Sequence, residues 1–384
     1  MDNPKVLISC GTKFHSDHVS FQLQKHQLLQ KAITSHPSGR YLNRVQLLKK
    51  NVTFLPPIFV IPYLLKKIPT IGNYLARLIE YRLPPIFDYM ASWFTRGANI
   101  SITWSWAGLY TMRKIKAKNG ITILEESGSC NLYQNELLAE EYNTLGLKFS
   151  SRTPDFITKR EMIEAAEADY ILCPSNYVAE SFIKKGIRPE KFFIIPYGVG
   201  LANFAPLYQQ NETFTILFVG TIGVRKGLIY LFKALELLKT YAPVECVLVG
   251  PVEQEFMPVF KKYHHLFTHA GRMPQTELVK FYNNASVFVF PSLDEGMALV
   301  QLEAMACGLP VITTTNAGAD AVITDGLDGF IIPIRDPAAI TNKIKVLYDS
   351  KELRDNMAIN AANKAKMFTW DSYGERLSAF INQL

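Results

Sequence analysis

The sequence predicts an α/β fold built from two doubly wound, Rossmann-like domains. Short apolar runs alternate with stretches of helical pattern along the chain, and this order is typical of parallel sheets with helices on both faces. The chain has 384 residues, more than a single hydrophobic core usually serves, so two domains are expected. A stretch rich in glycine and proline, residues 189–206, has the composition of a linker between them.

The first half opens with an apolar run at 5–10, a glycine turn at 11–12 and a helical stretch at 20–33. Strand, turn and helix in this order begin a parallel sheet. A further helix is expected at 160–168. The other strands expected in this half lie at residues 98–105, 120–126 and 169–175.

The second half repeats the same order. An apolar run at 214–220 is followed by a loop and by a helical stretch at 228–239. We therefore expect domains at 1–197 and 198–365, and we expect the last helical stretch, within 366–384, to pack back on the N-terminal domain. The other strands expected in this half lie at residues 244–250, 285–292, 309–315 and 328–334.

Composition narrows the class of protein. Apolar residues make up 48% of the chain and charged residues 20%, which is typical of a folded globular protein. The cysteines are scattered and form no Cys-x-x-Cys pair, which argues against a disulfide framework and a cysteine metal site and suits a reducing cytoplasm. The five cysteines are Cys10, Cys130, Cys173, Cys246 and Cys307.

Charge is distributed unevenly. Residues 1–120 contain 17 Lys and Arg against 4 Asp and Glu, a net charge of +13, whereas residues 201–384 contain 16 against 18, a net charge of −2. This asymmetry predicts an anionic partner for the first half only.

Residues 52–94 are rich in apolar and aromatic residues and also contain Lys66, Lys67, Arg77 and Arg82. The longest uncharged apolar run in the segment is too short and too often interrupted by proline for a transmembrane helix. The mixture fits an amphipathic element in a membrane interface, and it equally fits a buried helical pair of the first domain's core. The basic charge of the first half favours the membrane.

Two loops of the second half are suited to anions. The loop GTIGVRKG (220–227) lies between a strand and a helix, and Gly220 and Gly223 allow the backbone close to a phosphate. Arg225 and Lys226 lie near the helix start, where the helix dipole disfavours cations. An anionic ligand would compensate for that mismatch.

The second loop belongs to PSLDEGMALVQLEAMACGLPV (291–311), which places Glu295 directly after a strand. A helix is expected from about Met297 to Cys307, and its N-terminus would suit a diphosphate. Glu303 lies about two turns into that helix, so the spacing fits a nucleotide diphosphate sugar with the ribose on Glu303 and the sugar on Glu295. A solvated helix residue and a cap-region acid are the simpler interpretation of the spacing alone.

Four motifs in order resemble the C-terminal domain of family 4 retaining glycosyltransferases with the GT-B fold. The Glu-x7-Glu signature of that family is matched by Glu295 and Glu303. The first half is more loosely similar, through GTKFH (11–15), ESGSCNLYQNELLAEEYNTLG (126–146) and CPSNYVAESFIKKG (173–186), to bacterial members that build surface polysaccharides. The four motifs are GTIGVRKG, HAGRMPQTEL (269–278), PSLDEGMALVQLEAMACGLPVITT (291–314) and DGLDGFIIP (325–333).

The resemblance implies roles for particular residues. Arg225 and Lys226 would hold the donor's diphosphate and stabilise the leaving group. Glu303 would bind the ribose, and Glu295 would bind hydroxyls of the transferred sugar. Glu126 stands where the family often places a histidine, and it is therefore a candidate active-site residue; an ordinary acid at a strand end is the alternative.

Other parts of the donor site follow from the same resemblance. Arg272 and Met273 would lie against the base. Gly11 and Thr12 would line the cleft from the N-terminal domain, although the family usually has two glycines where this chain has Cys10-Gly11. Backbone amides expected to contact the sugar and phosphate belong to Gly296, Met297, Ala298, Leu299 and Val300.

The function that these features imply is a retaining glycosyltransferase (EC 2.4) that uses a UDP- or GDP-sugar. Its expected acceptor is lipid-linked or a polysaccharide, at the cytoplasmic face of the membrane, and no nucleic acid partner is expected. The chain has no Asp-x-Asp motif, so no metal cofactor is expected, and two cations and the helix end would stabilise the leaving diphosphate. The alternatives are an epimerase of the same fold and a catalytically silent module that binds a nucleotide sugar or a membrane.

Overall fold

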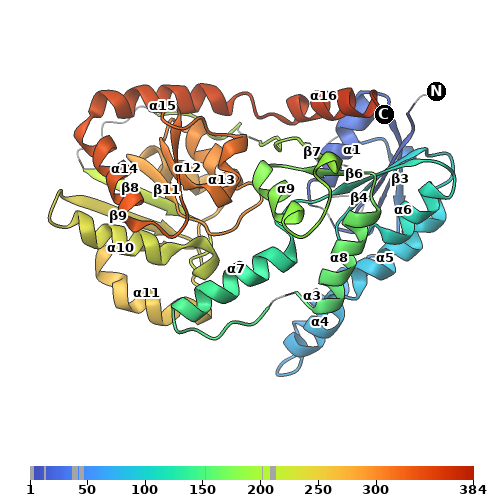
Figure 1. Cartoon of the computed structure of the whole chain (residues 1–384), viewed down its shortest axis with the longest axis horizontal. Coiled ribbons are helices and arrows are strands. Elements are labelled where there is room, and N and C mark those ends of the chain that lie inside the picture. The colour runs from blue at the N-terminus through green and yellow to red at the C-terminus, as the bar shows by residue number, and fades with distance from the viewer. Residues whose placement is uncertain are drawn as a thin grey trace.

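The computed structural model describes residues 4–12, 14–36, 42, 47–151, 153–200, 202–207 and 213–384. They form two parallel sheets, each with helices on both faces, and the two α/β halves lie side by side (Figure 1). The red C-terminal helices in Figure 1 extend from the second half back over the first. The predicted fold class is confirmed.

Among the described residues, seven strands form the N-terminal sheet, and every pairing in it is parallel. The order places β1 beside β4, so the sheet is doubly wound with its switch point between these strands. In spatial order, the strands are β3 (Val52–Phe54), β2 (Leu29–Thr34), β1 (Val6–Ser9), β4 (Ile100–Trp104), β5 (Ile121–Glu125), β6 (Tyr170–Cys173) and β7 (Phe192–Ile194).

The described part of the C-terminal half contains a six-stranded parallel sheet, with its switch point between β8 and β11. Its central strands are buried along their whole length, which explains why they appear in the sequence as continuous apolar runs. In spatial order, the strands are β10 (Thr268–Gly271), β9 (Val244–Val249), β8 (Phe214–Val219), β11 (Val287–Phe290), β12 (Val311–Thr314) and β13 (Gly329–Ile332).

Helices cover both sheets. Those of the first half are α1 (Ser16–Lys25), α3 (Val60–Leu65), α4 (Gly72–Glu80), α5 (Leu83–Ala91), α6 (Leu109–Lys116), α7 (Asn131–Thr144), α8 (Asp155–Glu167) and α9 (Asn176–Ile183). Those of the second half are α10 (Leu228–Leu238), α11 (Met257–Tyr263), α12 (Gln275–Asn283), α13 (Leu299–Ala306), α14 (Pro337–Asp349), α15 (Lys351–Ala365) and α16 (Trp370–Ile381).

Two of the local predictions are wrong. The helical stretch predicted at 20–33 ends at Lys25, and its second part forms β2, whose last three residues are buried. The segment predicted as a linker, 189–206, contributes β7 to the edge of the N-terminal sheet. The other predicted strands and helices are present, with ends that differ by a few residues.

The segment 52–94 divides into two environments. Helix α5 packs its buried residues, among them Phe87 and Ala91, into the core of the N-terminal domain. Helices α3 and α4 pack on each other but bury few of their residues, and they project from the molecule (Figure 1). In the described part of the chain, no helix has the length and apolar character that crossing a bilayer requires.

The last helix, α16, follows the C-terminal half in the sequence and packs on the N-terminal half. Helix α16 packs on α1, and Asp371 accepts hydrogen bonds from Gln22 Nε2 (2.8 Å) and Lys25 Nζ (2.9 Å). The ring of Phe380 stacks on Phe193 of β7, with 3.8 Å between the ring centroids. The C-terminal helix therefore belongs physically to the N-terminal half.

Candidate active site

Both anion-suited loops begin at the switch point of the C-terminal sheet. The loop 220–227 follows β8, and the loop that carries Glu295 follows β11, the neighbouring strand. The two loops are hydrogen-bonded to each other, since Leu293 N donates to Arg225 O at 2.9 Å. Gly227 has φ +65°, and a Cβ there would lie 2.0 Å from Pro291 O. Only glycine allows the loops to approach this closely.

Glu295 lies between the two cations predicted to bind phosphate. Arg225 Nη1 lies 2.7 Å from Glu295 Oε2, and Lys226 Nζ also pairs with that oxygen. Burial raises the pKa of Glu295, but Lys226 and Arg225 outweigh burial and hold it below its ordinary value. The structure thus brings together three of the residues chosen from the sequence, and this cluster carries a net positive charge.

Glu303 is half-buried on α13 and has two hydrogen-bond donors. Tyr282 OH donates to its Oε2 at 3.0 Å, and Gln275 Nε2 donates to its Oε1 at 3.1 Å. Glu303 is therefore an oriented carboxylate rather than a solvated helix residue. Arg272 and Met273 directly precede α12, which carries both donors, so the segment expected to meet the base neighbours the residue expected to meet the ribose.

The start of α13 differs slightly from the prediction. The helix begins at Leu299, and the amides before it are not equally available to a ligand. Ala298 N donates to Ala317 O at 3.4 Å, and Glu295 N donates to Asn316 O at 2.9 Å. Ala298 therefore has a protein partner, which the predicted set of five ligand-binding amides did not anticipate.

Residues beside Glu295 connect the two domains. Asp294 is buried and accepts hydrogen bonds from Tyr177 OH (2.7 Å), Gln134 Nε2 (2.5 Å) and Ser129 Oγ of the N-terminal domain. Gly296 also approaches that domain, since a Cβ on it would lie 2.0 Å from Ser127 O. The loop that carries Glu295 is thus held from both sides of the domain interface.

A cavity of about 580 Å³ lies between the domains, mainly on the N-terminal side. Gly11 and Thr12 line it from the end of β1, and Arg225 lines it from the C-terminal domain. Glu126 lines it from the end of β5. Four of the predicted site residues therefore share this cavity, whereas Glu295 and Glu303 are not among the residues that line it.

Glu126 is buried on the cavity wall. Its exposed fraction is 2%, and its Oε1 has no hydrogen-bond partner among the described residues. Burial and the nearby Glu161 carboxyl raise the pKa of Glu126 well above its ordinary value. Its neighbour Glu125 is bonded through Oε1 to Tyr197 OH (2.8 Å) and His15 Nε2 (3.1 Å).

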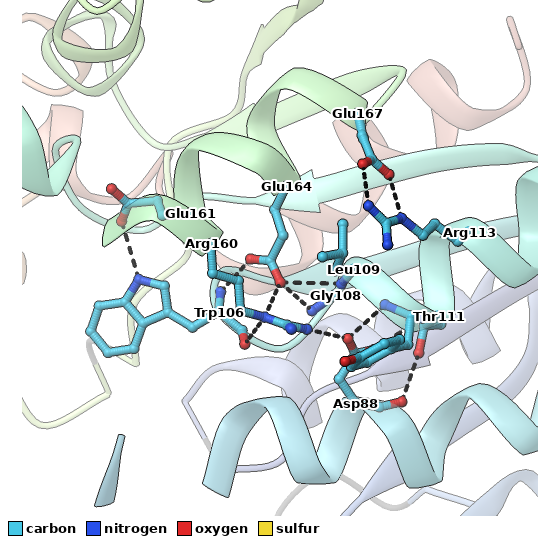
Figure 2. A network of polar contacts seen from close by, with 11 residues as sticks. Asp88, Trp106, Gly108, Leu109, Thr111, Arg113, Arg160, Glu161, Glu164 and Glu167 are labelled. Atoms are coloured by element: carbon cyan, nitrogen blue, oxygen red, sulfur yellow. Dashed lines mark hydrogen bonds and ion pairs between the residues drawn. The ribbon is translucent and has the colours of Figure 1, made fainter. Parts of the chain in front are cut away.

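Trp106 lies on the same wall in a conformation rare for a bulky residue, with φ +73°. Three hydrogen bonds fix it, and Figure 2 shows all of them. Trp106 N donates to Glu164 Oε2 (2.6 Å), its indole Nε1 donates to Glu161 Oε1 (3.1 Å), and its carbonyl accepts from Arg160 Nε (2.8 Å).

The same network fills the N-terminus of α6 (Figure 2). Glu164 Oε1 accepts from Gly108 N (3.0 Å) and Leu109 N (3.1 Å). Asp88 accepts from the next two amides, of Tyr110 and Thr111, and Arg160 pairs with both carboxylates. This helix start is therefore occupied by the protein's own carboxylates and supports the cavity wall from behind.

Sequence reasoning missed Asp88, Trp106, Glu161 and Asp294. One signal in α8 could have indicated the network, because Arg160, Glu161 and Glu164 share a helical stripe with the buried residues Ile157 and Ala165. Charged side chains on the apolar stripe of a helix need buried partners. No group of three His, Cys, Asp or Glu side chains that could hold a metal ion occurs within the described ranges.

Part of the chain is similar in sequence to known glycosyltransferases. Residues 202–364 match the family described as Glycosyl transferases group 1. The D-inositol 3-phosphate glycosyltransferase of Paenarthrobacter aurescens is 29% identical over 244 residues, covering 56% of this chain and 57% of that protein. CapM of Staphylococcus aureus, a capsular polysaccharide biosynthesis glycosyltransferase, is 30% identical over 187 residues, covering 45% and 48%. The chain spans about half the length of these curated relatives.

Solved structures resemble the whole chain. Sucrose-phosphate synthase from Thermosynechococcus elongatus superposes with a TM-score of 0.69 at 18% identity, over 99% of this chain and 98% of that one. HepE of Anabaena, in complex with UDP, has a TM-score of 0.67 at 15% identity, over 99% and 100%. At these identities the likeness shows the fold, which is the predicted GT-B architecture.

Proposed function

We propose, from the match of residues 202–364 to the glycosyl transferases group 1 family, that this protein is a glycosyltransferase (EC 2.4) whose donor is a UDP- or GDP-sugar. The observation that carries the proposal is the cluster of Arg225, Lys226 and Glu295 at the switch point of the C-terminal sheet, where such sheets bind ligands. The cavity between the domains, mainly on the N-terminal side, supplies room for an acceptor, which favours transfer over epimerisation.

Arg225 and Lys226 would bind the donor's diphosphate. Glu295 holds both cations in the structure, but a diphosphate carries more negative charge than one carboxylate and would replace it as their partner. Glu295 would then be free to accept hydrogen bonds from the sugar hydroxyls. Glu303, oriented by Tyr282, would accept from the ribose.

The remaining donor contacts are proposed from position. Arg272 and Met273 would lie against the base, and Gly11 and Thr12 would line the cleft opposite the donor. The glycines Gly220 and Gly223 would let the backbone approach the phosphates. Amides at the start of α13 would contact sugar and phosphate, and those proposed belong to Gly296, Met297, Leu299 and Val300, with a smaller part for Ala298.

The reaction would retain the anomeric configuration. The bond between sugar C1 and the diphosphate oxygen breaks, the acceptor oxygen bonds to C1 on the same face, and the acceptor proton passes to the departing diphosphate. Arg225 and Lys226 would stabilise the charge on that leaving group in place of a metal ion. Transfer should therefore continue in the presence of EDTA, and a requirement for Mg²⁺ or Mn²⁺ would contradict this part of the proposal.

Calorimetry with UDP, GDP, ADP and CMP tests the donor site. Either UDP or GDP should bind, and Arg225→Ala and Glu303→Ala should each weaken its binding at least about tenfold. Arg376→Ala and Glu375→Ala are matched controls, because both residues are exposed and lie on α16. Unchanged binding in Glu303→Ala would remove Glu303 from the site, and binding of none of the four would contradict the proposed function.

We also propose that the acceptor is lipid-linked or a polysaccharide and that the protein acts at the cytoplasmic face of the membrane. Helices α3 and α4 support the membrane part, because the large apolar side chains along them are exposed, including Tyr74 at 66%. Cations accompany them, among them Lys66 and Lys67. The other exposed apolar side chains there are Ile61, Tyr63, Leu64, Ile68, Ile71 and Leu78.

Sedimentation with lipid vesicles tests this surface. Phosphatidylcholine vesicles with about one third phosphatidylglycerol should bind the protein at low salt and release most of it at about 0.5 M salt. Replacing Ile71 and Tyr74 by serine should abolish binding. The matched control replaces Leu327 and Ile359, exposed apolar residues of the C-terminal half, and should bind as the wild type does. Failure of the wild type to bind would contradict the membrane part alone.

A further inference from the structure

We propose that the N-terminal wall of the 580 Å³ cavity is a subsite for an uncharged pyranose of the acceptor, with Trp106 as its stacking surface and Glu126 as a partner of its hydroxyls. The inference rests on the proposed glycosyltransferase function and deepens it. In this proposal the acceptor oxygen that receives the transferred sugar belongs to a sugar and not to a phosphate. The enzyme would then extend a glycan and would not begin one.

Trp106 is held ready for a ligand. A bulky residue with φ +73° costs of the order of 1–3 kcal/mol, and such strain persists only where the surroundings enforce it. Here Glu161, Glu164 and Arg160 enforce it through three hydrogen bonds. The indole lines the cavity beside Tyr81, with 6.1 Å between ring centroids. A flat aromatic face of this kind suits the C–H face of a pyranose ring.

Polar atoms without partners lie on the same wall. Trp104 Nε1, Glu125 Oε2 and Glu126 Oε1 are buried, and none has a hydrogen-bond partner among the described residues. Each such atom costs about 1–3 kcal/mol in the folded protein unless a ligand satisfies it. The indole nitrogen donates, a carboxyl oxygen accepts or, when protonated, donates, and sugar hydroxyls both donate and accept. A polyhydroxylated ring offers both kinds of hydrogen-bond partner to this wall.

The charge of the wall argues against an anionic acceptor. A phosphate at Trp106 would meet carboxyl groups, and the described cation of the lining, Arg225, is already bonded to Glu295 and to Asp294 O. Bringing a phosphate among these buried carboxyls, where the described lining offers no free cation, is unfavourable. The charged residues of the described lining are Glu80, Glu125, Glu126, Glu161, Arg225 and Glu253.

The proposed subsite also implies which reaction must come before this one. The acceptor hydroxyl oxygen forms a bond to donor C1, the bond from C1 to phosphate breaks, and the nucleoside diphosphate leaves with the acceptor proton. A different transferase must already have attached a sugar to the carrier, because this subsite takes a sugar. The product is the same glycan longer by one residue.

The experiment uses the full chain saturated with the nucleotide that binds it. Methyl α-D-glucoside, methyl α-D-galactoside and methyl α-D-mannoside are the neutral probes, and glucose 6-phosphate and farnesyl phosphate are the anionic ones. Calorimetry or saturation-transfer NMR should detect at least one neutral glycoside. Both phosphates should bind at least about tenfold more weakly than that glycoside.

Variants separate a binding role from a structural one. Trp106→Ala and Glu126→Ala should each weaken the glycoside at least about tenfold while nucleotide affinity is kept. Trp106→Phe, which keeps an aromatic ring, and Glu126→Gln, which keeps a neutral group with both a donor and an acceptor, should each bind within about threefold of wild type. Trp93→Ala and Glu136→Ala are controls, because both side chains are exposed and outside the cavity lining.

The outcomes are distinct. Tighter binding of either phosphate than of every glycoside, or unchanged glycoside binding in Trp106→Ala and Glu126→Ala, overturns the subsite. No glycoside binding by a protein that does bind a nucleotide also overturns it and leaves the donor site intact. Absence of nucleotide binding contradicts the proposed function instead.

Discussion

Tyr177 of the N-terminal domain donates a hydrogen bond to Asp294 of the C-terminal domain, with 2.7 Å between Tyr177 Oη and Asp294 Oδ1. Burial raises the pKa of Tyr177, and the Asp294 carboxylate raises it further, so the phenol remains a donor at every physiological pH. Asp294 directly precedes Glu295, the residue that pairs with Arg225 and Lys226. The position of the proposed donor site is thus linked to the contact between the two domains.

Tyr177→Phe should loosen this link. The variant removes one donor from a buried carboxylate that keeps Ser129 and Gln134, so the unfolding free energy should fall by about 1–2 kcal/mol. Nucleotide affinity should fall as well, because the Glu295 loop loses one restraint. Urea unfolding and calorimetry measure the two effects. Tyr241→Phe is the control, since Tyr241 is exposed and its hydroxyl bonds to Asp349, within the C-terminal half.

Gly296→Ala should push the two domains apart where Gly296 faces Ser127. A Cβ there would meet Ser127 O at 2.0 Å, and both atoms belong to backbone, so the domains must shift apart. We expect transfer to fall at least about tenfold, since misplacement by 1 Å is enough for a hundredfold loss in other enzymes. Gly200→Ala is the matched control, because a Cβ on Gly200 meets nothing within 4 Å. Full transfer activity in Gly296→Ala would show that the close approach of Gly296 to Ser127 is not needed for transfer.

The central strands could be predicted because they are buried on both faces. Residues 287–290 are all apolar, residues 311–314 combine apolar residues with threonines, and both segments are buried along their whole length. Neither segment has the spacing of polar residues that a helix exposed on one side would show. Strand β2 was mistaken for helix because Gln30 and Lys31 lie at its partly exposed end, where the apolar run is interrupted. The short strand β7 lies at a sheet edge and is only half-buried, so its sequence resembles a linker.

Arg160 should be among the most important residues for stability. It pairs with Asp88 and Glu164, which are fully buried, and Arg160→Met would leave both carboxylates without a cation. Breaking a buried pair in this way costs about 3–5 kcal/mol. The Arg113–Glu167 pair in the same region is exposed, and Arg113→Met should cost at most about 1 kcal/mol. Urea unfolding measures the stability lost in each variant. Equal losses in Arg160→Met and Arg113→Met would contradict the importance given to the buried Arg160 pairs.

The carboxylates of the proposed donor site could be chosen from the sequence, whereas the residues of the proposed acceptor wall could not. Glu295 and Glu303 lie within one strand–loop–helix unit, so their spacing along the chain almost fixes their spacing in space. Asp88, Trp106 and Glu161 come from three separate elements, and only the folded sheet brings them together. Patterns of sequence report local geometry, and this wall consists of long-range contacts.

Tyr282→Phe should weaken the proposed ribose contact without destroying the fold. Tyr282 OH holds Glu303 at 3.0 Å, and the ring itself packs in the core beside Phe204 and Phe288. The variant keeps that packing and removes one restraint on the carboxylate, so nucleotide affinity should fall about threefold to tenfold. A fall in the melting temperature with unchanged affinity would mean that the bond serves only the fold.

Stability against pH tests the state of Glu126. Its pKa in the folded protein is raised by burial first and by Glu161 second, so folding favours the protonated form. The stabilisation by that form is complete below the unfolded value of about 4.3 and is lost as the pH rises through the folded value. Glu126→Gln stays neutral, so it should equal the wild type near pH 4 and be more stable at pH 8.

The gain in stability expected of Glu126→Gln at pH 8 comes from the environment of the Glu126 carboxyl. At pH 8 an ionised Glu126 would lie beside Glu125, Glu161 and Glu164, with one oxygen unbonded, and Gln removes that repulsion. Urea unfolding at several pH values measures the difference, and Glu136→Gln, an exposed residue, should show none. A structural role for Glu126 requires the opposite sign, with Glu126→Gln the less stable protein at pH 8. A gain in stability would instead identify a carboxyl that is kept at a cost to the fold, which is expected of a group that serves a ligand.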